Sequence, residues 1–448
     1  MRKLILVELF WTRDKDPRVP LAMGSLLAAT RHAGIDVRGL TYPVNGANFD
    51  RDQILADIEE LLEEHQNFDV GFGVYVWNEE DVQELGQQLR YHHPNLRIIL
   101  GGPQISYSGK GLEERYPFAT AFVRGYGESA LIELMTRGGR PAIDGVHWAG
   151  TTDFGLQTNV DLEELPSPFL TGLIDVTDQR FLRWETKRGC SFRCAFCQHR
   201  EAGKRLTRRE LNRTRLLAEI DLFCNSGVDD IAVLDPIFNQ GSEYMAVLNQ
   251  FLHHTYDGHL SLQCRFEMVD DAFLDLVTQL NCTLEFGLQT IHREEGEAVN
   301  RPNHMPRVDE VIDKLHRRDI HFEVSLIFGL PRQTLTSFED SIAYCLDRYV
   351  PVIKAFPLMM LRGTPLERDR HRWGLIESQD RIPRVIASDS YGRDEWERMA
   401  ALSEALKSTE GEHPASLAEL RRLAAAHAPD LRRWTPEKMP LDAISGTA

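Results

Sequence analysis

Two successive series of alternating strands and helices constrain the fold of this 448-residue chain more than any other feature. In residues 1–150, short apolar runs alternate with amphipathic helical stretches, and glycines mark the turns. The predicted strands are 4–10, 37–42, 70–76, 98–100 and 119–123, and the predicted helices are 21–32, 54–64, 81–91 and 129–137. Continuous apolar strands separated by such helices are typical of a parallel sheet covered on both faces. We therefore predict an α/β domain with a doubly wound, Rossmann-like sheet, which binds ligands at the carboxyl ends of its strands.

A second alternating series follows a stretch with turn formers and no clear periodicity. Its predicted strands are 182–187, 230–234, 260–265, 283–288, 322–327 and 352–357, with longer helices between them. About six such units predict a partial or complete (β/α) barrel, whose site lies at the carboxyl-end loops. We predict a first domain over 1–150, a linker over 151–180, the barrel over 181–371 and a helical C-terminal region over 372–448. Helices are expected there at 394–407 and 416–427.

The charge and the apolar runs exclude two classes of partner. Lys and Arg total 51 against 68 Asp and Glu, a net charge of −17, which disfavours a broad nucleic-acid footprint. No apolar run approaches the roughly 20 residues needed to span a bilayer. The apolar stretch at the N-terminus is interrupted by Glu8 and lacks a signal-peptide cleavage site, so it indicates a first strand. We expect a cytoplasmic protein with neither nucleic-acid nor membrane partners.

Three of the seven cysteines fall within eight residues, at Cys190, Cys194 and Cys197. An odd number of cysteines in a long chain without a secretion signal argues against a disulfide framework. Three thiolates in one short loop suit a soft metal. A structural zinc ion would need a fourth ligand, for which His199 is available. A four-iron cluster on three cysteines leaves one iron open to a further ligand, and the position of the loop after the first barrel strand favours this catalytic arrangement.

The C-x3-C-x2-C spacing, with the aromatic Phe196 before the last cysteine, resembles the signature of the radical S-adenosylmethionine (radical SAM) superfamily. The resemblance covers about residues 181–361. It implies a [4Fe-4S] cluster on Cys190, Cys194 and Cys197, and a SAM molecule that chelates the fourth iron. It further implies reductive cleavage of SAM to methionine and a 5′-deoxyadenosyl radical, with an electron donor such as flavodoxin or ferredoxin.

The same resemblance suggests SAM-binding residues at the ends of later barrel strands. Asp235 follows the second strand, where many members of the superfamily contact the SAM amino group. Arg265 would pair with the SAM carboxylate, and Glu267 would reach a ribose hydroxyl. The alternative for these two residues is a surface ion pair. Gln289, at the end of the fourth strand, would face the ligand cavity.

The first domain resembles the cobalamin-binding domain of the cobalamin-dependent subclass. This resemblance rests on three groups of loop residues, which are Pro20 and Leu21, then Gly101, Gly102, Pro103 and Gln104, then Gly125, Gly127 and Glu128. Small residues at strand ends would let a flat corrin lie close to the backbone. No D-x-H-x-x-G element is present, so we expect no lower axial histidine, and Tyr75, Trp77 and Asn78 are candidates to lie near the lower face or the nucleotide tail. The alternative is a doubly wound domain with an empty or nucleotide-type crevice.

Taken together, these resemblances imply a cobalamin-dependent radical SAM enzyme, most simply a C-methyltransferase that acts on an unactivated carbon of a small metabolite or natural-product precursor. Ring contraction, cyclisation or transfer of another SAM-derived group is the alternative within the subclass. A zinc-stabilised small-molecule binding protein is the alternative outside enzymes. The expected cofactors are the [4Fe-4S] cluster, SAM and cobalamin, and the sequence identifies neither the substrate nor the catalytic residues.

Overall fold

The computed structural model describes residues 2–64, 67–199 and 210–426. The chain divides into two compact units, one formed by residues 1–182 and 201–227 and the other by residues 183–200 and 228–448.

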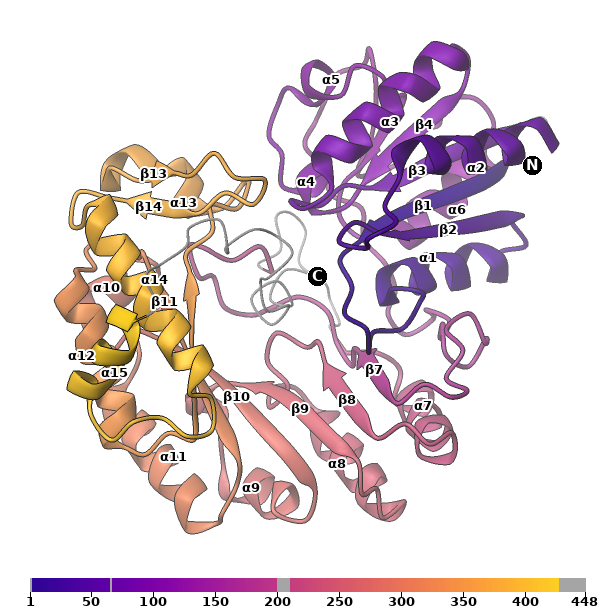
Figure 1. Cartoon of the computed structure of the whole chain (residues 1–448). Helices are drawn as coiled ribbons and strands as arrows, with labels where there is room; N and C mark the ends of the chain where they lie inside the picture. Colours follow the sequence, from indigo (N-terminus) through magenta and orange to yellow (C-terminus); the bar gives the residue numbers. More distant parts are fainter. Residues whose placement is uncertain (1, 65–66, 200–209, 427–448) are drawn as a thin grey trace. The chain divides into compact units, whose positions relative to one another are not determined.

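The first unit contains a six-stranded sheet in the order β2-β1-β3-β4-β5-β6 (Figure 1). The strands are β1 (Lys3–Phe10), β2 (Val37–Pro43), β3 (Phe68–Gly73), β4 (Arg97–Gly101), β5 (Ala121–Val123) and β6 (Val146–Trp148). The helices are α1 (Leu21–His32), α2 (Arg51–Glu64), α3 (Glu79–His92), α4 (Pro103–Ser106), α5 (Leu112–Arg115) and α6 (Gly127–Thr136). The neighbours β2 and β3 lie on opposite sides of β1, so the strand order reverses there. This confirms the doubly wound fold and puts its switch point between β1 and β3.

Alternate residues of β1 belong to different cores. Ile5, Val7 and Leu9 pack with α2 and α3 in one hydrophobic cluster, whereas Leu4 and Leu6 pack with α1 and α6 in another. Because successive side chains of a strand point to opposite faces, an uninterrupted apolar strand requires helices on both sides. The nearly continuous apolar run of β1 therefore explains the three-layer arrangement.

One edge of this sheet differs from the prediction, because β6 pairs antiparallel with β5. After α6 ends at Thr136, residues 137–145 contain three glycines and a proline and form no helix. An extended segment of nine residues spans up to about 30 Å, enough for the chain to return to the carboxyl end of β5 before it pairs. The sequence did not indicate this strand, because three residues are too few to show an alternating pattern.

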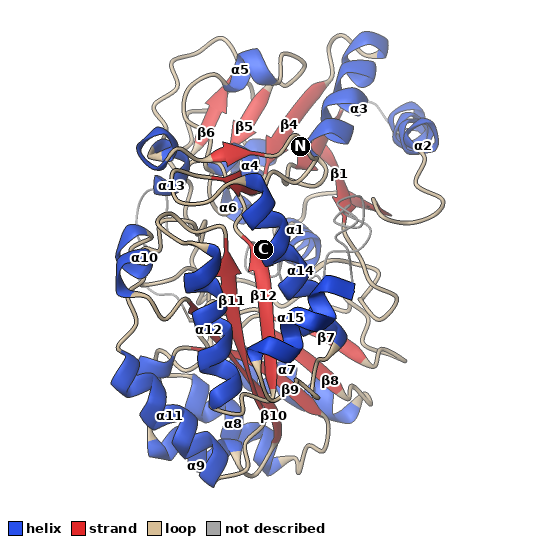
Figure 2. Cartoon of the chain, turned by 60° about the vertical axis from the view of Figure 1, so that its left-hand side comes forward, coloured by secondary structure: helices blue, strands red, loops and turns tan. Residues whose placement is uncertain are grey.

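The second sheet has six strands in the sequential order β12-β11-β10-β9-β8-β7 (Figure 2). The strands are β7 (Phe181–Trp184), β8 (Asp230–Val233), β9 (His259–Cys264), β10 (Asn281–Gln289), β11 (Phe322–Phe328) and β12 (Val352–Pro357). The pairs from β8 to β12 are parallel. The first and last strands are not neighbours, so of the two predicted architectures the partial barrel is the correct one.

Helices occupy the connections of the partial barrel. They are α7 (Arg213–Asn225), α8 (Tyr244–His253), η1 (Phe266–Met268), α9 (Asp271–Val277), α10 (Arg293–Ala298), α11 (Met305–Arg317), α12 (Leu335–Asp347), α13 (Pro365–Arg368) and η2 (Arg370–Trp373). Several of them begin with a side-chain cap, as at Asp270, where the carboxylate accepts a hydrogen bond from the Phe273 amide. Such caps satisfy backbone donors that the first helical turn leaves free.

The C-terminal region is helical as predicted over α14 (Arg393–Ser408) and α15 (Leu417–Ala426), while residues 427–448 lie outside the described residues. Before α14, the strands β13 (Ile376–Glu377) and β14 (Val385–Ala387) form a small antiparallel pair that the sequence did not indicate. The Ser403 hydroxyl of α14 donates to the Ala355 carbonyl of β12 at 2.7 Å. The C-terminal helices are therefore attached to the last barrel strand.

Candidate functional site

The loop that carries the three clustered cysteines begins just after β7. Cys194 is buried, and Cys190 and Cys197 are partly buried. The Cys190 amide donates to the His199 carbonyl at 3.2 Å, which brings the two ends of the loop together. Burial raises the pKa of the Cys197 thiol to about 12, and the neighbouring thiols of Cys194 and Cys190 contribute to this rise. The three predicted ligands therefore lie close enough together to interact electrostatically.

Asp235, at the end of β8, holds the segment that leads into the cysteine loop. Its fully buried carboxylate accepts hydrogen bonds from the Thr186 amide at 2.7 Å and the Lys187 amide at 3.1 Å, and also from the Thr186 hydroxyl. Burial raises the pKa of Asp235, and the nearby Lys187 ammonium opposes that rise. The carboxylate thus directs its bonds to β7 and the loop. Contact with the SAM amino group stays a prediction.

Lys187 adds a second connection between the loop and β8, which the sequence did not indicate. Its buried ammonium donates to the Phe238 carbonyl at 2.9 Å and to the Gln240 carbonyl. Both acceptors belong to the loop after β8. The start of the cysteine loop is therefore fixed by a buried charge and by backbone bonds, which is the rigid support that a cofactor site needs.

Arg265 and Glu267, at the end of β9, form the ion pair that the sequence left open as an alternative. The guanidinium reaches both carboxylate oxygens at 3.1 Å, and its centre lies 3.7 Å from the ring centroid of Phe192 in the cysteine loop. Burial raises the pKa of Glu267, but the Arg265 hydrogen bond and charge outweigh this and leave it below its usual value. The Arg265 side of the pair is buried, and the pair borders the cysteine loop. Contacts of these two residues with SAM stay predictions.

Gln289 ends β10 at an irregularity in the strand pairing. Its φ of +68° is in the left-handed region, which is costly for a residue with a side chain. A Cβ on Gly287 would lie 2.5 Å from the Gln289 amide nitrogen, so the glycine makes room for that side chain. The structure thus gives Gln289 an unusual, constrained position at the strand end.

Phe196, the aromatic residue before the last of the three cysteines, is partly exposed within the cysteine loop.

In the first unit, the loops after β3 and β4 lie side by side at the carboxyl edge of the sheet. The Val74 amide donates to the Gly101 carbonyl at 2.8 Å, and the Gln104 amide donates to the Val74 carbonyl at 3.0 Å. Gly102 has a φ of +89°, and a Cβ there would lie 2.8 Å from the backbone nitrogen and oxygen of Val74. Pro103 begins α4. Glycine at 102 is therefore required by this close backbone approach.

Three predicted residues after β3 pack against the end of β1. The Asn78 side chain accepts from the Tyr75 amide at 2.8 Å and donates to the Leu9 carbonyl at 2.8 Å. The Trp77 indole donates to the same carbonyl at 3.3 Å, and its ring stacks on Tyr75 with centroids 4.6 Å apart. These bonds cross the switch point of the sheet. Val74 directly precedes Tyr75 and is hydrogen-bonded to Gly101 and Gln104. This group therefore lies next to the Gly101–Gln104 loop.

The sequence patterns did not single out a buried carboxyl group that lies at this switch point, between β1 and β3. Glu8 of β1 is 6% exposed, and burial raises its pKa to about 8, although its interaction with the Tyr75 hydroxyl lowers it in part. A Cβ on Gly73 would lie 2.7 Å from the Glu8 carboxyl oxygen. A single acidic residue within an otherwise apolar strand was the sequence signal that could have identified it.

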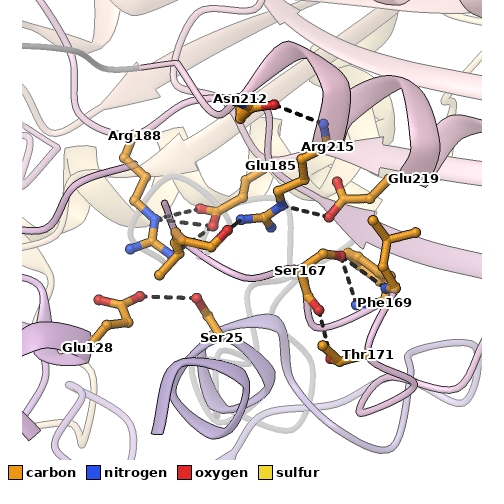
Figure 3. Close-up of polar contacts among 12 residues, drawn as sticks. Ser25, Glu128, Ser167, Phe169, Thr171, Glu185, Arg188, Asn212, Arg215 and Glu219 are labelled. Carbon is orange, nitrogen blue, oxygen red and sulfur yellow. Dashed lines mark hydrogen bonds and ion pairs between the residues drawn. The ribbon is translucent and has the colours of Figure 1, made fainter. Parts of the chain in front are cut away.

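The other predicted residues of this unit lie at the starts of α1 and α6. Pro20 precedes α1 and Leu21 is its first residue, while Gly127 and Glu128 begin α6. The Ser25 hydroxyl donates to the buried Glu128 carboxylate at 3.0 Å (Figure 3). Gly125, with a φ of +85°, would place a Cβ 2.6 Å from the Thr158 carbonyl oxygen. This group meets the segment after β4 through the Gly125 amide, which donates to the Ser106 hydroxyl of α4 at 3.0 Å.

Residues of the predicted linker (151–180) are hydrogen-bonded to the start of α7. The Arg215 guanidinium donates to the Glu219 carboxylate at 2.9 Å and to the Leu165 carbonyl at 2.9 Å (Figure 3). The Ser167 hydroxyl accepts from the Phe169 amide at 3.1 Å and closes a turn. The segment that was predicted as a linker therefore has defined contacts within the first unit.

Two features are absent from the described residues. None of the described helices is both long and apolar enough to cross a membrane. Across residues 2–64, 67–199 and 210–426, no three His, Cys, Asp or Glu side chains converge as they would around one metal ion. An iron–sulfur cluster is instead held by thiolates on its separate irons, and the cysteine loop supplies three such donors.

Comparison with family models defines the class of each domain. Residues 184–345 match the model of the radical SAM superfamily, and residues 17–135 match that of the B12 binding domain. The partial barrel with its cysteine loop is thus a radical SAM domain, and the doubly wound sheet is a B12-binding domain. The chain therefore carries a B12-binding domain followed by a domain of the radical SAM superfamily.

Curated relatives and solved structures agree with this assignment. A cobalamin-dependent radical SAM methyltransferase, TokK of Streptomyces tokunonensis, is 26% identical over 321 residues, which are 66% of this chain and 47% of TokK. The 2-(S-pantetheinyl)-carbapenam-3-carboxylate methyltransferase of Streptantibioticus cattleyicolor is 26% identical over 348 residues, 67% of this chain and 48% of that protein. This chain spans about half the length of these two relatives.

Among solved structures, the methyltransferase TsrM from Kitasatospora setae, with cobalamin and a [4Fe-4S] cluster bound, has a TM-score of 0.68 at 19% identity. The match covers 89% of this chain and 82% of TsrM. The radical enzyme OxsB, with aqua-cobalamin and SAM bound, has a TM-score of 0.70 at 16% identity, with 91% and 67% covered. These likenesses show that the fold is shared.

Proposed function

We propose that this chain is a cobalamin-dependent radical SAM enzyme that transfers a methyl group from SAM to a carbon atom of a small molecule. The observation that carries the proposal is the partly buried three-cysteine loop after β7, in a domain of the radical SAM superfamily that follows a B12-binding domain. The curated relatives TokK and the carbapenam enzyme are named as methyltransferases, which supports methyl transfer as the reaction.

Cys190, Cys194 and Cys197 would bind the cluster, and their donor set fits it, since three thiols leave one of four irons free for SAM. When bound, the cluster supplies the electron that cleaves SAM, and cobalamin supplies the methyl group. The residues of the chain position these groups. Asp235 and Lys187 fix the cysteine loop against β8. Arg265, Glu267 and Gln289 would orient SAM at the ends of β9 and β10.

In the B12-binding domain, the carboxyl edge of the sheet would hold the corrin. Gly101, Gly102, Pro103 and Gln104 fit that role, because this loop places backbone rather than side chains at the end of β4. Tyr75, Trp77 and Asn78 are fixed across the switch point and would line the lower face or the tail. Pro20, Leu21, Gly125, Gly127 and Glu128 would contribute from the starts of α1 and α6. The absence of a D-x-H-x-x-G element from the sequence predicts a corrin without a lower histidine ligand.

The proposal includes an electron donor such as flavodoxin or ferredoxin and a cytoplasmic location. All seven cysteines are free, which suits a compartment that keeps thiols reduced. The strongly acidic composition supports the expectation that nucleic acid is not a partner.

Labelled SAM tests the reaction. The full chain, reconstituted anaerobically with iron, sulfide and cobalamin, is supplied with a reductant, SAM deuterated in its methyl group, and a panel of small molecules. The panel includes tryptophan, the substrate named for TsrM, and the pantetheinyl carbapenam of the second curated relative. We expect one product that carries an intact three-deuterium methyl group, together with 5′-deoxyadenosine. A product with another SAM-derived group, or one altered without any SAM carbon, would show that the chain catalyses the alternative chemistry.

A further inference from the structure

A segment after α10 runs along the cysteine loop and holds it at three consecutive residues. The Ala195 amide donates to the Val299 carbonyl at 2.7 Å, and the Asn300 side-chain amide donates to the Arg193 carbonyl at 2.8 Å. The third residue, Arg301, places a guanidinium nitrogen 3.7 Å from the Cys194 sulfur. Main-chain and side-chain contacts therefore align this segment with the residues on both sides of Cys194.

The Arg301 guanidinium is held by β10 from its other side. One terminal nitrogen donates to the Gly287 carbonyl, and a Cβ on Gly287 would lie only 3.0 Å from that nitrogen. The Nε atom is buried without a hydrogen-bond partner within the described residues. An arginine with a buried, unsatisfied donor is costly unless another group compensates it. The orientation of the side chain is thus fixed, and its positive charge is directed at the sulfur.

Arg301 differs from the other guanidinium beside the loop. Arg265 is paired with both oxygens of Glu267, so its charge is largely balanced. In the part of the chain that the structure describes, Arg301 forms no ion pair, and it interacts with the Glu267 carboxylate only at longer range. Its charge is therefore available to whatever negative charge the three thiolates and their cluster carry.

A cluster gains one negative charge when it is reduced. Hydrogen bonds to its sulfur atoms and nearby positive charge stabilise the reduced form and raise the reduction potential. We propose that Arg301 is a positioning residue of the cluster site, which donates to the Cys194 sulfur and makes the cluster easier to reduce. The inference rests on the proposed function, because it requires the cluster on Cys190, Cys194 and Cys197.

The test compares R301Q, R301K and R293Q in the full chain, reconstituted anaerobically. Arg293 lies on α10 with an 85% exposed side chain that pairs with Glu297, so R293Q is a matched loss of one charge away from the loop. Iron and sulfide are measured first, and the reduced fraction of the cluster is then followed by electron paramagnetic resonance during a redox titration. A purely structural role for Arg301 would change the cluster content without moving the titration of the clusters that remain.

At the potential where half of the unaltered clusters are reduced, we expect the ratio of reduced to oxidised cluster to fall about three- to tenfold in R301Q, the size expected for one partly screened charge. R301K keeps the charge and should change the ratio by less than about twofold, and R293Q should leave it unchanged. An unchanged ratio in R301Q with full iron would overturn the inference.

The remaining outcomes also decide the question. If R301Q lacks the cluster but R301K assembles it, the positive charge acts in cluster assembly, and the inference is wrong. If both lack it while R293Q is normal, Arg301 acts in assembly and the inference is wrong. If the unaltered chain assembles no cluster, the proposed function itself fails, and this result is distinct from the others.

Discussion

Glu8 shows how one buried residue can make stability depend on pH. Its folded-state pKa of about 8 lies well above the usual value near 4.5, because β1 buries the carboxyl group. Between these two values the folded chain keeps the proton and the unfolded chain loses it. The stability that the protonated group contributes is therefore fully present below about pH 4.5 and is lost as pH rises to about 8.

Replacing Glu8 by Gln should remove this dependence, since the amide is similar in size and does not ionise. We expect the melting temperature of E8Q to exceed that of the unaltered chain at pH 8, and the difference to shrink toward pH 5. Thermal unfolding followed by circular dichroism at several pH values measures it. An equal difference at pH 5 and pH 8 would show that Glu8 does not keep its proton in the folded state.

Glu8 and Arg301 also show which roles of individual residues local sequence patterns can and cannot predict. The cysteines were predictable because their ligand chemistry is expressed in local spacing. Glu8 had a weak signal, an acidic residue in an apolar strand, but its neighbours Gly73 and Tyr75 come from β3 and the loop after it. Arg301 had none, because it reaches Cys194 across 107 positions of sequence. Such long-range contacts are set by tertiary packing, which local patterns do not encode.

At the scale of elements, the loops after β3 and β4 depend on one glycine. Gly102 needs a positive φ and has no space for a side chain beside Val74, whereas the atom nearest to a Cβ on Gly101 would be 3.8 Å away. We expect G102A to destabilise the first unit by roughly 1–3 kcal/mol and to reduce cobalamin retention. G101A, the matched control for stability, should lower the melting temperature much less.

Thermal unfolding and the cobalamin retained after desalting test this pair of variants. If G102A kept full stability and cobalamin, the loop would not require its left-handed conformation. If G101A behaved like G102A, any side chain in this loop would be harmful, and the argument from the Val74 contact would be wrong.

The elements themselves were largely predictable. The helix over 21–32 and the strand over 352–357 have the bounds that the sequence indicated, because strong apolar periodicity and flanking prolines or glycines define them. The strands β6, β13 and β14 were missed, since each has only two or three residues and depends on its partner strand. Pairing of very short strands is decided by the surrounding fold rather than by their own sequence.

At the scale of the whole molecule, the chain combines a doubly wound sheet with a partial barrel. Folds of both kinds bind ligands at the carboxyl ends of their strands. The sequence could not decide between partial and complete closure of the barrel, because closure depends on the pairing of distant first and last strands. The substrate is likewise not readable from either domain.

The central claim is that one chain holds both an iron–sulfur cluster and a corrinoid. Elemental analysis of the full chain, reconstituted anaerobically and desalted, tests it directly, with C194A and C224S as variants. We expect about four iron and about one cobalt per chain, loss of the iron but not of the cobalt in C194A, and neither loss in C224S, whose cysteine belongs to α7 and not to the cluster motif. One zinc per chain without cobalt, or unchanged iron in C194A, would contradict the account.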